Sequence, residues 1–382
     1  FYRAWLETSM LRLTDVQLPL DHQEEDIQAA ILARLGIAAD DLIGYTIFRR
    51  GYDARKKSAI TLVYTLDVEV KNEAKVQKRL AGNRHVGATP DTSYHFVAQA
   101  PAGLKTRPVV IGTGPCGIFA GLILAQMGFN PIILERGKAV RERTKDTFGL
   151  WRKRELHPES NVQFGEGGAG TFSDGKLWSQ VKDPKHYGRK VLTEFVKADA
   201  PEEIMYVSKP HIGTFRLVKM VELMRASIEE LGGEFRFESK VDDIEIENGQ
   251  VRGLKLADGT HIETDHVVLA IGHSARDTFQ MLHARGIYIE PKPFSMGFRI
   301  EHPQSLIDRC RFGPNAGNEI LGAADYKLVH HASNGRSVYS FCMCPGGTVV
   351  AATSEPGRVV TNGMSQYCLL YTSPSPRDQR GS

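Results

Sequence analysis

The fold is decided by the stretch PVVIGTGPCGIFAGLILAQMGFNPIILER, which occupies residues 108–136. It opens with three apolar residues, at 109–111, that are typical of a buried parallel strand. Three glycines with the spacing G-x-G-x-x-G follow, and then an apolar stretch long enough for a helix. A second apolar run, at 132–134, ends in an acidic residue. Strand, glycine-rich turn, helix and second strand in this order predict a dinucleotide-binding βαβ unit.

Each glycine of the turn has its own physical role in such a unit. Gly112 allows the tight turn from strand to helix, and Gly114 lets a pyrophosphate approach the backbone because it lacks a Cβ. Gly117 allows the helix to pack closely on the strand. The first N–H groups of the helix then favour the phosphates, and Glu135 can accept hydrogen bonds from ribose hydroxyls. Neighbouring residues that we also expect to contact the cofactor are Pro115, Cys116 and Arg136.

A second glycine cluster, FGEGGAGTFSDGKL, occupies residues 164–177. Its small residues, Gly168 among them, expose backbone N–H groups, and Thr171 and Ser173 add hydroxyls. Taken alone, the cluster fits a flexible lid as well as a cofactor-binding loop. Because it follows a dinucleotide fingerprint, we expect it to contact the cofactor.

The segment before the fingerprint forms a unit of its own. Residues 60–69 alternate strictly between inward and outward positions, which predicts a half-buried strand. With the flanking patterns, residues 10–97 predict a small ferredoxin-like α+β domain, and residues 98–107 a linker. The basic loop Arg49–Lys57 could bind an anion or an acidic partner, but a solvated hairpin is the favoured interpretation.

Short strands follow an amphipathic helix in the second half of the chain. Residues 241–247 and 251–256 flank Asn248-Gly249, a strong hairpin signal, and residues 267–272 are a buried strand that ends in glycine. The pattern predicts an α/β fold, with a Rossmann-type domain at 108–180 and 234–280 that contains a β-meander. Residues 181–233 and 281–366 are expected to form an inserted α+β substrate or cap region.

Composition narrows the function. The chain has 382 residues, of which 41% are hydrophobic and 24% charged, as in an ordinary globular protein. A net charge of +3 gives no reason to expect a nucleic-acid or membrane partner. The five cysteines form no evident disulfide framework or metal site, so we expect a reducing compartment. That compartment would be the cytoplasm, or the plastid stroma if the source is a plant or an alga.

The two ends of the chain differ from the rest. Residues 1–9 precede a well-patterned segment that begins at Met10, and we expect them to be a non-native extension. Residues 367–382 shift abruptly to Ser, Pro and Arg, and we expect a non-native tail there. On this interpretation the natural protein continues beyond about residue 366.

Together these motifs resemble flavoproteins with two dinucleotide-binding domains, and most closely the FAD-dependent dehydrogenases that carry a ferredoxin-like N-terminal domain. The resemblance covers residues 10–365 and includes the segments 209–214 and 340–347. It implies that the glycine turn and Glu135 hold FAD, and that Val241 lies against the adenine. Further residues that it places along the cofactor are Gly168, Thr171, Ser173, Ala270 and Gly272. The family's last FAD-contacting element, near its C-terminus, is expected to be missing here.

Candidate catalytic residues are few. His211 could donate a proton near the flavin, although a packing histidine is favoured. Cys342 and Cys344 form a C-x-C pair that could relay electrons, but small packed residues are again the favoured interpretation. No catalytic residue or metal ligand is therefore assigned.

The sequence predicts an FAD-dependent oxidoreductase that acts on a small molecule through hydride or electron transfer. Only one dinucleotide fingerprint is recognised, so NAD(P)H is expected, if at all, as a transient electron donor at the flavin. Two alternatives stay open: an NAD-dependent dehydrogenase that uses the same turn, and a non-catalytic flavin-stabilised protein whose N-terminal domain binds a partner.

Overall fold

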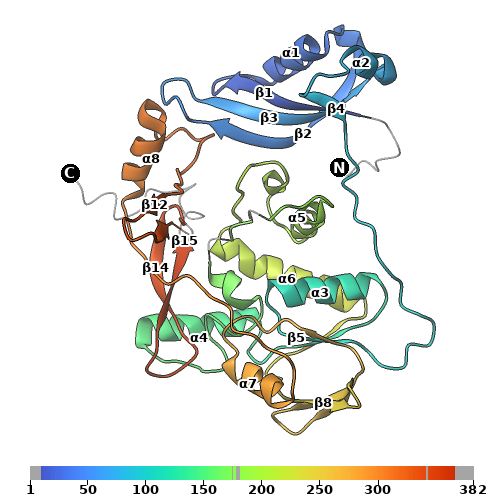
Figure 1. Cartoon of the computed structure of the whole chain (residues 1–382), viewed down its shortest axis with the longest axis vertical. Helices are drawn as coiled ribbons and strands as arrows, with labels where there is room; N and C mark the ends of the chain where they lie inside the picture. The colour runs from blue at the N-terminus through green and yellow to red at the C-terminus, as the bar shows by residue number, and fades with distance from the viewer. Residues whose placement is uncertain (1–9, 174, 178–180, 341–342, 366–382) are drawn as a thin grey trace.

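The N-terminal unit is a four-stranded antiparallel sheet with two helices on its outer side (Figure 1). The computed structural model describes residues 10–173, 175–177, 181–340 and 343–365. The strands are β1 (Leu11–Pro19), β2 (Leu42–Asp53), β3 (Thr61–Val70) and β4 (Val86–Ala88), in the order β2-β3-β1-β4. The helices are α1 (Glu24–Leu35), α2 (Glu73–Arg79) and the short η1 (Ala39–Asp41). This is the ferredoxin-like βαββαβ arrangement expected from the sequence, and the short strand β4 is its last strand.

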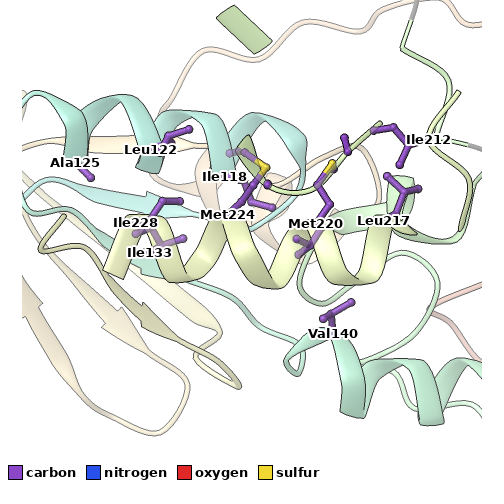
Figure 2. Packing of buried hydrophobic residues seen from close by; sticks show 14 of the residues in the cluster. Ile118, Leu122, Ala125, Ile133, Val140, Ile212, Leu217, Met220, Met224 and Ile228 are labelled. Carbon is purple, nitrogen blue, oxygen red and sulfur yellow. The ribbon is translucent and has the colours of Figure 1, made fainter. Parts of the chain in front are cut away.

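The fingerprint builds a parallel sheet at the centre of the chain. Its strands are β5 (Val109–Ile111), β6 (Ile132–Leu134), β7 (Glu234–Arg236) and β11 (Val267–Leu269), in the order β11-β5-β6-β7. The helices packed on one face are α3 (Pro115–Gln126) and α6 (Thr214–Glu230). Figure 2 shows Ile118 and Leu122 of α3 beside Met224 and Ile228 of α6, in one hydrophobic core with Ile133.

The other face of the parallel sheet is covered by the meander and a helix. These elements are β8 (Val241–Glu247), β9 (Gln250–Leu256), β10 (His261–Glu263) and α7 (Arg276–Ala284). The meander strands pair antiparallel, as their turn residues predict. Val109 and Leu134 of the parallel sheet share a core with Leu254 and Leu282 from this layer. The predicted α/β fold class is confirmed.

One region lies differently from the expected division of the chain. Residues 181–233 were assigned to the substrate region, yet α6 is part of the Rossmann core and leads directly into β7. The preceding helix α5 (Tyr187–Lys197) contacts the same core through Leu192 and Phe195. The amphipathic helix predicted from the sequence is therefore present as α6, but the surface that it covers is the parallel sheet.

The remaining elements surround this centre. They are α4 (Val140–Lys153), α8 (Gln304–Phe312), the short helices η2 (Gly168–Phe172), η3 (Glu202–Met205) and η4 (Gly313–Asn315), and the hairpins β12 (Val329–His331) with β13 (Ser337–Tyr339) and β14 (Gly347–Ala352) with β15 (Val360–Ser365). Among the described residues, no helix has both the length and the hydrophobicity needed to cross a membrane.

The basic loop of the N-terminal unit packs against the body of the same chain. Arg50 N donates to Tyr206 O at 2.7 Å, and Ser208 N donates to Arg50 O at 2.8 Å. The β2–β3 hairpin also meets α8, where Phe312 is completely buried in one cluster with Ile60. Part of this loop is thus an internal interface, and the binding of an outside partner there stays a prediction.

Candidate functional site

A cavity of about 510 Å³ opens at the carboxyl ends of strands β5, β6 and β11. Ligands of open α/β sheets bind at such an edge, and the volume lies in the range of small-molecule sites. The segments that line the cavity are the turn at 111–116, the end of β6 with Glu135 and Arg136, residues 163–165 and 168–170, residues 239–241, and residues 269–282 in part.

The first glycine turn is as tight as the sequence predicts. Gly112 has a φ of +100°, and a Cβ there would lie 2.4 Å from the carbonyl oxygen of Ala270. A Cβ on Gly117 would lie 1.8 Å from Gly112 O, so α3 could not pack on β5 with any other residue at this position. Gly114 is the N-cap of α3, and a Cβ there would meet nothing closer than 3.8 Å. The space beside Gly114 therefore belongs to the cavity.

The second glycine cluster lies directly on the first. Gly167 N donates to Thr113 O at 2.9 Å, and a Cβ on Gly168 would lie 2.7 Å from the Cα of Gly114. Gly168, Ala169 and Gly170 line the cavity next to the N-terminus of α3. Two glycine loops that are 50 residues apart in the chain thus form one backbone-lined wall, where side chains would keep an anion at a distance.

Glu135 lines the cavity but is held by its own backbone surroundings. Its side chain is buried, and its two oxygens accept four hydrogen bonds. The donors are Thr113 N at 3.0 Å, Thr113 Oγ1 at 2.5 Å, Gly137 N at 2.9 Å and Gly165 N at 3.0 Å. Because a carboxylate offers about four acceptor sites, Glu135 ties three loops together in this structure. Its role as a ribose ligand stays a prediction.

Arg136 belongs to a four-charge network at the rim of the cavity. Its guanidinium donates to Glu159 at 2.5 Å and to both oxygens of Asp277 at 2.9 Å. Lys240, which also lines the cavity, lies 2.8 Å from Asp277. Burial alone would raise the pKa of Asp277, but the hydrogen bonds from these two cations outweigh it and hold the pKa well below its usual range. Burial also opposes the charge of Arg136, yet its two carboxylate partners raise the pKa of Arg136 above its ordinary value.

The structure places most of the predicted cofactor residues around the cavity. These residues are Gly112, Gly114, Pro115, Cys116, Glu135, Arg136, Gly168, Val241, Ala270 and Gly272. Gly117, Thr171 and Ser173 are not among the described residues that line it. Ser173 Oγ donates to Gly170 O at 2.6 Å within its own loop, and Thr171 Oγ1 faces Glu166 O on the buried side.

The candidate catalytic residues lie elsewhere. His211 pairs with Lys176 in an isolated bridge beside the second glycine cluster, and it does not line the cavity. Cys344 is half-buried next to the β14–β15 hairpin and does not line the cavity. Cys342 lies outside the described residues. In the part of the chain that the structure describes, no group of three His, Cys, Asp or Glu side chains could hold a metal ion.

Several lining residues were not found from the sequence. Lys240 and His273 each lie next to a predicted residue, so their position at a strand end was an available signal. Thr278 and Phe279 come from the first turns of α7, and no local pattern marks them. Further lining residues that the sequence does not predict are Gln163, Ser239 and Ser274.

Comparison with known proteins agrees with this geometry. Residues 176–313 match the FAD dependent oxidoreductase family, residues 293–369 match a family described as FAD-dependent protein, C-terminal domain-like, and residues 10–69 match a domain of unknown function. A protein of Clostridium beijerinckii, described only as an uncharacterized protein, is 41% identical over 381 residues, which are 97% of this chain and 71% of that protein. The chain is an FAD-dependent oxidoreductase. It belongs to the same family as the clostridial protein.

Solved structures resemble the chain only in part. The THI4 protein of Thermovibrio ammonificans is 20% identical, with a TM-score of 0.33, over 48% of this chain and 64% of that protein. Glycine oxidase from Bacillus cereus is 16% identical, with a TM-score of 0.26, over 48% of this chain and 59% of the oxidase. The chain spans less than two thirds of both proteins, and neither likeness bears on its activity.

The cavity fits the cofactor that the family implies. An added Cβ would clash with backbone at Gly112 and Gly168, so the cavity wall beside the N-terminus of α3 consists of backbone without side chains. Such a wall suits a pyrophosphate, and the apolar side chains of Leu134, Ile271 and Phe279 suit a flat ring system.

Proposed function

We propose that the cavity holds FAD and that the protein is a dehydrogenase or reductase of a small-molecule substrate. The single observation that carries this proposal is the contact of the two glycine loops at the N-terminus of α3. There Gly112, Gly114 and the first N–H groups of the helix would hold the pyrophosphate. When bound, the flavin supplies hydride or single-electron chemistry, while the protein binds and orients the reactants.

NAD(P)H is proposed as a transient electron donor to the flavin. Support comes from the sequence, in which we recognise one dinucleotide fingerprint, and its turn lines the cavity assigned to FAD. A nicotinamide would then approach the exposed edge of the flavin without a domain of its own. An NAD-dependent dehydrogenase that uses the same turn is the competing assignment.

An absorbance spectrum tests the cofactor. We expect the purified protein to show a flavin spectrum that is lost in Gly114→Glu, because the carboxylate would fill the cavity and repel the pyrophosphate. Gly87→Glu is the matched control, since an added Cβ in β4 meets nothing within 4 Å. A wild-type protein that stays colourless and takes up no FAD would overturn the proposal. Stopped-flow reduction with NADH and NADPH then identifies the donor.

A further inference from the structure

Arg143 of α4 is buried completely, behind the second glycine cluster and away from the cavity lining. Its guanidinium donates to three backbone carbonyls, two of them just before that cluster and one within it. Nε donates to Asn161 O at 2.8 Å, Nη2 to Val162 O at 2.9 Å, and Nη1 to Glu166 O at 2.5 Å. Only arginine can reach three such acceptors at once with a rigid planar fork.

The loop is held from both sides by opposite charges. Arg143 donates hydrogen bonds to carbonyl groups within residues 161–166, while Glu135 accepts a hydrogen bond from the N–H of Gly165 at 3.0 Å. Gly165 itself fits between them, because a Cβ there would lie 2.4 Å from Arg143 Cδ. The next residues, Gly168 to Gly170, line the cavity. The shape of the cavity wall therefore depends on hydrogen bonds made on its hidden side.

The positive charge of Arg143 is stabilised by the dipoles of the carbonyl groups that it contacts and by the negative charges of Glu135 and Glu166. Burial lowers the pKa of Arg143 to about 10, and Glu135 and Glu166 oppose this effect. The group thus stays a cation at neutral pH. A buried cation is tolerated only where its donors are satisfied, and loss of the donors would leave the carbonyls without partners.

We propose that Arg143 is a positioning residue for FAD, which fixes residues 161–170 in their cofactor-binding shape before the cofactor arrives. The proposal rests on the assignment of FAD to this cavity. Arg143 does not touch the cofactor in this account. It acts by binding the carbonyl groups on the buried side of the loop, so that the small residues Gly168 to Gly170 line the cavity on the other side.

Substitution of Arg143 gives the direct test. Arg143→Gln and Arg143→Lys are compared with Arg141→Gln on the same helix, where the arginine is mostly exposed and pairs with Glu222. The dissociation constant of FAD is measured by flavin fluorescence on apoprotein, together with the visible circular dichroism of the bound flavin. We expect both Arg143 variants to bind FAD about 10–100-fold more weakly, with altered dichroism, and Arg141→Gln to behave as wild type. An Arg143→Lys variant with wild-type affinity and dichroism would overturn the proposal.

Amide hydrogen exchange on the wild-type apoprotein keeps the proposal testable if the variants do not fold. The N–H groups of Gly165, Glu166 and Gly167 all have backbone or Glu135 acceptors. We expect them to be protected without FAD, as in the holoprotein. Protection that arises only when FAD is added would overturn the positioning role while leaving FAD binding intact. A wild-type protein that never binds FAD would refute the proposed function itself, so the two failures are distinct.

Discussion

At Gly117, the backbone of α3 lies so close to the backbone of Gly112, the residue that follows β5, that any side chain must separate them. We expect Gly117→Ala to destabilise the protein by about 1–3 kcal/mol, the usual range for overpacking, and to weaken FAD binding. Thermal unfolding and flavin absorbance measure both effects. Gly114→Ala is the control: its methyl group has room, so the apoprotein should unfold as wild type while its FAD affinity falls. An equal loss of stability in both variants would contradict this account.

Asp277 makes stability depend on acid. Because Arg136 and Lys240 hold its folded pKa below the unfolded value, its ion pairs stabilise the protein fully above about pH 4. That contribution is lost as the pH falls through the folded pKa. We therefore expect Asp277→Asn to lower the melting temperature of the apoprotein at pH 7 and to flatten its decline below about pH 4. Asp242→Asn, at an exposed position, is the control. It should change neither the melting temperature at pH 7 nor the decline of the melting temperature in acid.

For single residues, the sequence predicts the location of the fingerprint glycines better than it predicts the hydrogen-bond partners of polar side chains. The glycines of the fingerprint could be placed because each allows a backbone approach that depends on one residue. The hydroxyls of Thr171 and Ser173, together with the family resemblance, predict that both residues contact the cofactor. Those hydroxyls turn to carbonyls of their own loop, and that choice depends on Arg143 and Gly170, which no local pattern links to them.

Helix α6 covers the parallel sheet through residues spaced along one face. Ile228 is fully buried there, against α3 and β6. We expect Ile228→Ala to cost about 2–5 kcal/mol, because it leaves a cavity between two layers of the core. Leu231→Ala, at an exposed position just beyond the helix, should cost less than about 1 kcal/mol. Urea denaturation of both variants measures the difference, and similar midpoints would show that α6 packs elsewhere.

Elements with strong periodicity could be predicted from the sequence, but their neighbours could not. The sequence predicts the amphipathic helix that the structure shows as α6, yet the apolar face of a helix does not by itself show which sheet it covers. Strand β4 could not be predicted, because three residues are too few to show an alternation of apolar and polar side chains. In the structure these residues pair with β1. The position of α7 beside the cavity could not be predicted either, because it depends on the packing of α7 against the meander.

Phe312 packs α8 against the β2–β3 hairpin, which lies far from it in the sequence. This side chain lies on Tyr52 at 5.5 Å between ring centroids and closes the cluster between the β2–β3 hairpin and α8. We expect Phe312→Ala to cost about 3–5 kcal/mol and to speed proteolysis of the linker at 98–107. FAD binding should be retained, because no residue of this cluster lines the cavity. Phe294→Ala, at an exposed position, is the control, and equal cleavage rates would contradict the expectation.

The contact between the β2–β3 hairpin and α8 can form only after α8 has been synthesised. Asn315 Nδ2 donates to Lys57 O, and these residues are 258 positions apart. At a translation rate of about 5–20 residues per second, the hairpin waits roughly 10–50 s for α8 to emerge. The N-terminal unit has its own hydrophobic core and can fold during that interval. Its hairpin, with Ile60 and Tyr52 still uncovered, is then the surface of the nascent chain that we expect a chaperone to bind.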